Sequence, residues 1–216
     1  MKRLLVILFL APSLAMMAQQ KSYTIVFLNT KPEAEKLDKE TSSKLMEGHM
    51  ANINRLAKEG KLLAAGPFEG GGGLFIMNTT SLEEAEGWVA TDPAVQAERW
   101  NIELLPYIPR TGSVCPVSEP YEMVMYTFVR FNATVHKATA STYPVIIGQH
   151  EKFMRERVDP SKIVTEAIFG DNEGGILIVK DELPADLFAQ DPGVQQGLLD
   201  VDTRKLYIAR KSFCEK

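Results

Sequence analysis

The chain contains few of the residues that build metal, redox or nucleic-acid sites. Its 216 residues include two cysteines and three histidines, and its formal net charge is −4. No Cys-x-x-C motif is present, so zinc binding and thiol redox chemistry have little support. No stripe of lysine and arginine occurs either, which argues against a nucleic-acid partner. We therefore predict a protein that uses no metal, no cofactor and no nucleic acid.

A long apolar run is missing as well. The sequence begins Met1-Lys2-Arg3, continues with an apolar run over 4–11, and then has small residues at 13, 15 and 18. This run is too short to span a bilayer as a helix. A basic start, a short apolar core and a small-residue exit are typical of a secretory signal peptide, although a buried N-terminal strand has a similar pattern. We predict a signal peptide over 1–18 and a periplasmic or secreted protein that leaves the membrane after cleavage.

Export would place the two cysteines in an oxidising compartment. Cys115 lies in the middle of the chain and Cys214 near its end. They could form a disulfide there. Two free thiols are equally compatible with the sequence, because the distance between their Cα atoms decides the matter.

Two of the three histidines belong to a pattern that occurs twice. His49 precedes Asp92-Pro93, and His150 precedes Asp191-Pro192 at nearly the same interval. Around each pair the predicted elements follow the order β-α-β-β-α-β, which is the ferredoxin-like order. We predict a first half over 22–109, a proline-rich linker over 110–120 and a second half over 121–213. Because each half would leave one sheet face uncovered, we expect the halves to pack sheet to sheet as an α+β barrel with the helices outside.

Local patterns predict the elements of each half. Runs rich in β-branched and aromatic residues indicate strands, and apolar residues at helical spacing indicate helices. In the first half we expect strands over 22–29, 61–68, 74–77 and 99–107, with helices from 41–43 to 59 and over 81–90. In the second half we expect strands over 121–131, 163–169, 175–179 and 205–213, a turn at 171–174, and helices over 143–157 and 184–189.

The first half also carries a set of short motifs in a fixed order. These are a helix with His49, then Leu56-Ala-Lys-Glu-Gly60, Ala65-Gly66-Pro67, Leu82-Glu-Glu-Ala85 and Thr91-Asp92-Pro93. With this set the first half resembles the YCII-related family of the dimeric α+β barrel superfamily. The second half resembles a degenerate copy. It keeps His150 and Gln190-Asp191-Pro192, but it has Ala167-Ile168 where the first half has Gly66-Pro67.

The resemblance implies a ferredoxin-like fold, self-association through sheet faces and a His–Asp site in a pocket that takes a small molecule. Carried over to this chain, it implies that His49 and Asp92 form the catalytic pair, and that His150 and Asp191 form a possible second site. Gly66, Pro67 and Tyr23 are candidates for the pocket wall. A homo-oligomer is a possible assembly.

Two interpretations of a His–Asp pair stay open. Asp92 could accept a hydrogen bond from His49 and fix its tautomer, so that the other ring nitrogen exchanges a proton with a bound molecule. The same bond could instead only hold a helix against a loop, since Asp-Pro is a common turn. We favour the first pair as the working site, because the family motif is complete there and Ala167-Ile168 alters the second pocket. The third histidine, His136, is expected to be an exposed loop residue.

Overall fold

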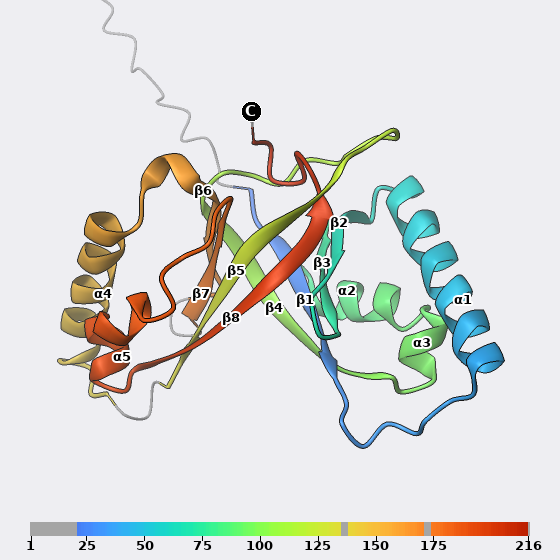
Figure 1. The fold of residues 1–216 in the computed structure, drawn as a ribbon, viewed down its shortest axis with the longest axis horizontal. Helices are drawn as coiled ribbons and strands as arrows, with labels where there is room; N and C mark the ends of the chain where they lie inside the picture. Colours follow the sequence, from blue (N-terminus) through green and yellow to red (C-terminus); the bar gives the residue numbers. More distant parts are fainter. Residues whose placement is uncertain (1–20, 135–137, 171–173, 216) are drawn as a thin grey trace, which may run out of the picture.

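The fold is α+β, as the sequence predicts. The computed structural model describes residues 21–134, 138–170 and 174–215. The predicted signal peptide, His136 and residues 171–173 of the predicted turn lie outside these ranges. The described residues form one antiparallel sheet with helices on two opposite sides (Figure 1).

The N-terminal part of the barrel contains four strands and three helices. Its elements are β1 (Tyr23–Thr30), α1 (Lys39–Lys58), β2 (Leu62–Pro67), β3 (Gly73–Met77), α2 (Leu82–Val89), α3 (Pro93–Gln96) and β4 (Trp100–Thr111). The C-terminal part follows a similar order. Its elements are β5 (Met123–Ala133), α4 (Tyr143–Arg157), the 3-10 turn η2 (Pro160–Lys162), β6 (Ile163–Ile168), β7 (Gly174–Val179), the 3-10 turn η3 (Leu187–Gln190), α5 (Pro192–Gln195) and β8 (Leu199–Ala209).

The strands join edge to edge into a closed barrel. Their order is β2-β3-β1-β4-β6-β7-β5-β8, so the order within the first four strands recurs in the last four. The two sets meet where β4 pairs with β6, with Ile108 opposite Ile168. They meet again through a bridge between Phe68 and Leu206, beside which the Glu69 N–H donates to the Lys205 carbonyl at 2.9 Å. In Figure 1, α1 and α3 lie on one side of this barrel and α4 and α5 on the other.

The interior of the barrel is an aromatic core shared by both parts of the chain. Phe27 of β1 packs edge-on against Phe128 of β5 and Phe169, with ring centroids 6.1 and 5.9 Å apart. Full burial of each such ring contributes about 1.5–3 kcal/mol. The Arg130 guanidinium lies 4.3 Å from the centre of the Phe27 ring and forms two hydrogen bonds, of 2.8 and 2.7 Å, to the Glu103 carboxylate. This core and this ion pair hold the two parts together.

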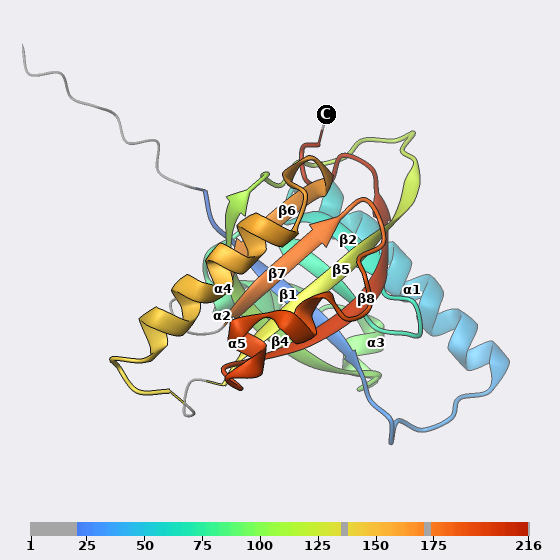
Figure 2. The ribbon, with the colours of Figure 1, turned by 60° about the vertical axis from the view of Figure 1, so that its left-hand side comes forward.

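A second apolar layer lies between the outer face of the sheet and the helices. Side chains alternate across a strand, so Ile25 and Phe27 point into the barrel while Val26 and Leu28 point towards α1 and α2. The same alternation in the C-terminal part directs Val129 towards α4, which lies alongside β7 in Figure 2. Strands buried on both faces explain the nearly continuous apolar runs in the sequence.

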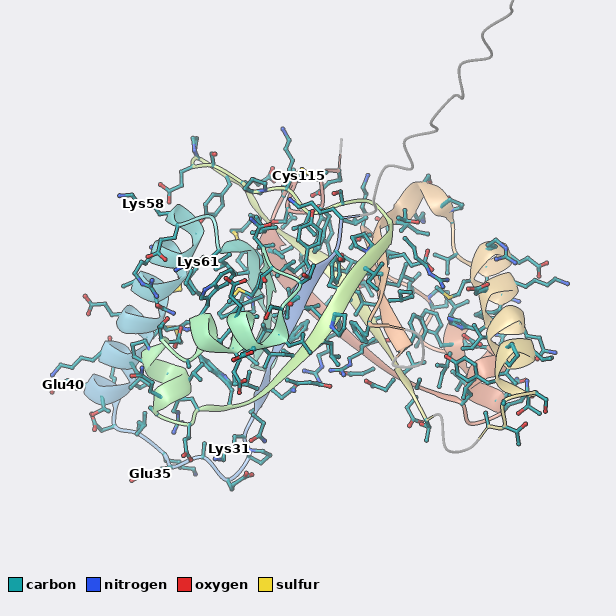
Figure 3. The ribbon with its side chains drawn as sticks, turned by 180° about the vertical axis from the view of Figure 1, so that it is seen from behind. Lys31, Glu35, Glu40, Lys58, Lys61 and Cys115 are labelled. Atoms are coloured by element: carbon teal, nitrogen blue, oxygen red, sulfur yellow. A yellow bond between two sulfur atoms is a disulfide. The ribbon has the colours of Figure 1, made fainter. Side chains whose placement is uncertain are left out.

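Cys115 and Cys214 form a disulfide with a Cα–Cα distance of 5.2 Å. The alternative of two free thiols is therefore wrong for this structure. The bond ties the segment after β4 to the C-terminal tail, and Figure 3 shows Cys115 at the end of the barrel where that tail lies.

Several predicted boundaries are wrong by a few residues. The helix predicted over 184–189 is instead the 3-10 turn η3, which begins at Leu187, and β5 covers Met123–Ala133 rather than 121–131. Helix α1 begins at Lys39, because the Asp38 side chain accepts the N–H groups of Glu40 and Thr41 as its N-cap. Strand β4 continues to Thr111, past its predicted end and into the predicted linker. Strand β8 covers Leu199–Ala209 rather than 205–213, because it pairs along the whole of β5. By contrast, α4 has both ends as predicted.

Candidate functional site

The first His–Asp pair joins α1 to the start of α3. Asp92 is the N-cap of α3, and its Oδ1 accepts the Ala94 N–H at 2.9 Å. Pro93 occupies the first helical position, where a missing N–H costs nothing. The other carboxylate oxygen of Asp92 lies 2.7 Å from His49 Nδ1 and accepts a bond of 3.3 Å from the Asn52 amide. One carboxylate therefore caps a helix and holds the histidine.

The charge state of Asp92 decides which ring nitrogen of His49 carries hydrogen. Burial alone would raise the pKa of Asp92, which is fully buried. The hydrogen bond and the charge of His49, with the bonds from Ala94 and Asn52, outweigh burial, and the pKa of Asp92 is lowered. An ionised carboxylate can only accept, so the His49 Nδ1 donates and Nε2 is left as the proton acceptor.

Two aromatic rings cover His49. Its ring lies 5.0 Å from the Trp100 ring and 6.0 Å from the Phe75 ring, with the latter nearly parallel at 21°. The His49 side chain is 10% exposed. Little room is left beside His49 for a ligand in this structure.

The second pair has the same geometry. His150 lies on α4, and Asp191 is the N-cap of α5, with its Oδ1 accepting the Gly193 N–H at 2.7 Å. His150 Nδ1 lies 2.6 Å from the other oxygen of Asp191. The Asp191 side chain is fully buried and that of His150 is 15% exposed. Phe131 contacts the ring edge-on, with centroids 5.0 Å apart.

His150 lines a cavity of about 730 Å³. The cavity lies between α4 and the strands β6 and β7, and the end of β4 contributes Arg110 to its wall. Arg110 forms an ion pair of 2.6 Å with Glu151 of α4. Ala167 and Ile168, which stand where the first half has Gly66-Pro67, are part of the lining.

Trp100 marks one difference between the surroundings of the two pairs. Trp100 is the first residue of β4, and Leu199 is the first residue of β8, the strand in the corresponding position. Trp100 covers the His49 ring, whereas the smaller Leu199 lines the cavity beside His150. The two strands therefore present side chains of different size to the two histidines.

The structure does not bring the three pocket candidates to His49. Tyr23 is 2% exposed and points into the barrel, where its ring lies 6.3 Å from that of Tyr107. Gly66 lies against β8, and a Cβ there would be 2.6 Å from the Tyr207 carbonyl oxygen, so this glycine allows the barrel to close. Pro67 is exposed at the end of β2.

Several residues of the two sites were not predicted. Asn52 lies one helical turn after His49, and this spacing could have identified it. The covering role of Trp100 and the ion pair of Arg110 depend on contacts between distant elements, which no local signal reveals.

Within the described residues, no three His, Cys, Asp or Glu side chains form a metal-binding group. No helix in those ranges is long and apolar enough to cross a bilayer.

These features define an α+β barrel that carries a His–Asp pair on each of its two helical sides. Residues 23–106 match the model of the YCII-related domain. No curated protein matches the chain.

Two solved structures of mutant chlorite dismutase from Candidatus Nitrospira defluvii are similar in fold. The one in complex with cyanide has a TM-score of 0.54 and 8% identity, and the match covers 88% of this chain and 91% of that chain. The second has a TM-score of 0.50 and 8% identity, with coverage of 88% and 92%. At this identity the likeness concerns the fold alone.

Proposed function

We propose that this protein binds a small molecule and uses a His–Asp pair as its acid/base group. In this proposal the chain is an exported tandem of two ferredoxin-like, YCII-like halves, each with one pair. The recurrence of the strand order in the two parts supports the tandem. The disulfide supports export, because such bonds persist in oxidising compartments.

The observation that carries the proposal is the bond from each histidine ring to a fully buried carboxylate. The distances are 2.7 Å for His49–Asp92 and 2.6 Å for His150–Asp191. With Nδ1–H donated to the aspartate, the ring has one tautomer and presents Nε2 as a base. The aspartate then stabilises the imidazolium that forms when Nε2 takes a proton. The proposal extends to His49 and Asp92, because the first half carries the full set of motifs that resembles the YCII-related family.

A structural role is the second candidate for the His49 pair. Trp100 and Phe75 cover the ring, and Asn52 supplies Asp92 with a further hydrogen bond. These contacts are what a packing bond between α1 and α3 requires. In that case the pair stabilises the fold and binds nothing.

The experiment compares His49→Gln and His150→Gln with the wild-type chain in a ligand-observed NMR screen of small fragments. His136→Gln is the matched control, because this histidine belongs to neither pair. Melting temperatures by circular dichroism are measured alongside. The proposal expects at least one fragment whose binding is lost in a folded His49 or His150 variant and kept in the control. Loss of melting temperature with unchanged fragment binding would contradict it and support the structural role.

A further inference from the structure

We propose that the cavity beside His150 is the ligand site of this protein, and that it takes a small apolar molecule bearing an acidic hydroxyl, such as a phenol or an enol. This inference rests on the proposed function and names both the working pair and the class of ligand. The hydroxyl would donate its hydrogen bond to Nε2 of His150.

The size and lining of the cavity indicate an apolar ligand body. Its volume of about 730 Å³ lies within the range of small-molecule sites, roughly 300–1,000 Å³. Apolar side chains from α4, β5 and β8 line it, among them Phe131, Ile147, Met154 and Leu199. A surface of this kind favours a ring or a short hydrocarbon over a strongly hydrated molecule.

The charges around the cavity favour a neutral ligand. Arg110 and Arg155 contribute two cations to the lining, and Glu151 and Glu166 contribute two anions. Arg110 is already paired with Glu151 at 2.6 Å. A carboxylate ligand would have to compete with Glu151 for this arginine, whereas an uncharged ligand would not.

His150 determines which kind of polar group the ligand must carry. His150 Nδ1 is bound to Asp191, so Nε2 is the nitrogen that remains to meet a ligand, and in the neutral ring it is an acceptor. A ligand must therefore offer a donor. An acidic O–H fits best, because its proton can pass from the hydroxyl oxygen to Nε2, which leaves an oxyanion beside an imidazolium that Asp191 stabilises.

The site belongs to the C-terminal side because the two sides are not equivalent. On the other side Trp100 lies 5.0 Å from the His49 ring and fills the position that Leu199 leaves open. The cavity nevertheless needs both parts of the chain, since Arg110 comes from β4. The site is therefore formed only when β4 pairs with β6.

The test uses 4-nitrophenol as the probe and 4-nitroanisole as its control, which has a methyl group in place of the hydroxyl hydrogen. The nitrophenolate ion absorbs visible light, so proton transfer on binding is seen directly in an absorbance titration of the full mature chain. Binding of both compounds is also measured by calorimetry. We expect at least tenfold tighter binding of 4-nitrophenol, equivalent to about 1.4 kcal/mol.

Four variants locate the site. His150→Gln should abolish the preference for 4-nitrophenol, and Ile147→Trp should weaken binding of both compounds at least tenfold by filling the cavity. Val145→Trp is the matched control and should bind as the wild type does, and His49→Gln reports on the other His–Asp pair. Val145 is 58% exposed on the same helix as Ile147, so its replacement adds a tryptophan to α4 outside the cavity. If Ile147→Trp does not fold, Ile147→Phe takes its place.

Each adverse result has a distinct meaning. Equal binding of the two compounds to the wild type would overturn the ligand class. Binding that is lost in His49→Gln and kept in His150→Gln would overturn the choice of site, while the proposed function would stand. Absence of saturable binding of either compound would overturn this inference. The proposed function falls only if the fragment screen finds no ligand that depends on either histidine.

Discussion

Replacement of Asp92 by alanine should destabilise the protein strongly, because this carboxylate serves several partners at once. Its N-cap bond to α3 is worth about 1 kcal/mol. The substitution also leaves the His49 ring and the Asn52 amide, both buried, without their acceptor, at about 1–3 kcal/mol for each group. We therefore expect the free energy of unfolding to fall by roughly 3–5 kcal/mol, allowing for relaxation of the site.

The assay is equilibrium unfolding in urea, followed by tryptophan fluorescence and by far-ultraviolet circular dichroism. Both tryptophans, Trp88 and Trp100, lie in the N-terminal part, so fluorescence reports on the side that carries the substitution. Asp38→Ala is the matched control, since Asp38 is an exposed N-cap that holds no histidine. If Asp92→Ala costs no more than Asp38→Ala, the central role of this carboxylate is refuted.

Three further predictions concern the disulfide, the response to acid and the cover over His49. Replacing Cys115 and Cys214 by serine should lower the free energy of unfolding by about 4–5 kcal/mol on the chain-entropy model, because the disulfide closes a loop with a sequence separation of 99. Thermal melts with and without reductant measure this loss of stability. Because the pKa of Asp92 is lower in the folded than in the unfolded protein, its ionised carboxylate stabilises the fold. This stabilisation is complete above the unfolded pKa of about 3.9 and is lost as the pH falls through the folded pKa. Asp92→Asn should therefore show a shallower loss in urea unfolding between pH 7 and pH 3 than the wild type. Trp100→Leu should open His49 to solvent and lower the free energy of unfolding by about 1–3 kcal/mol. Mass spectrometry should then find faster modification of His49 by diethyl pyrocarbonate. An unchanged rate would show that Trp100 does not cover His49.

Much of the fold follows from local patterns, because the barrel is built from strands buried on both faces. The apolar runs around Phe27 and Phe128 identify β1 and β5, and α4 has clear helical spacing. Strand β8 was predicted to begin several residues too late because Asp200 and Asp202 break the apolar pattern at its start. They are tolerated there because pairing with β5 holds the backbone.

The candidate site was predictable only in part. The interval between each histidine and its Asp-Pro pointed to side chains that the structure places within hydrogen-bond distance. The difference between the two sides could not be predicted in the same way. It depends on side chains such as Trp100 and Phe75 beside His49 and Leu199 beside His150, which meet the histidines only once the strands lie against the helices.

Nitrogen-15 NMR of the histidine rings tests the central claim most directly, since the chain has only three histidines to assign. The spectrum is recorded with and without saturating 4-nitrophenol. We predict that the Nε2 resonance of His150 moves from the unprotonated towards the protonated position while the resonances of His49 stay in place. A His150 resonance that does not move, or a change confined to His49, would contradict the account.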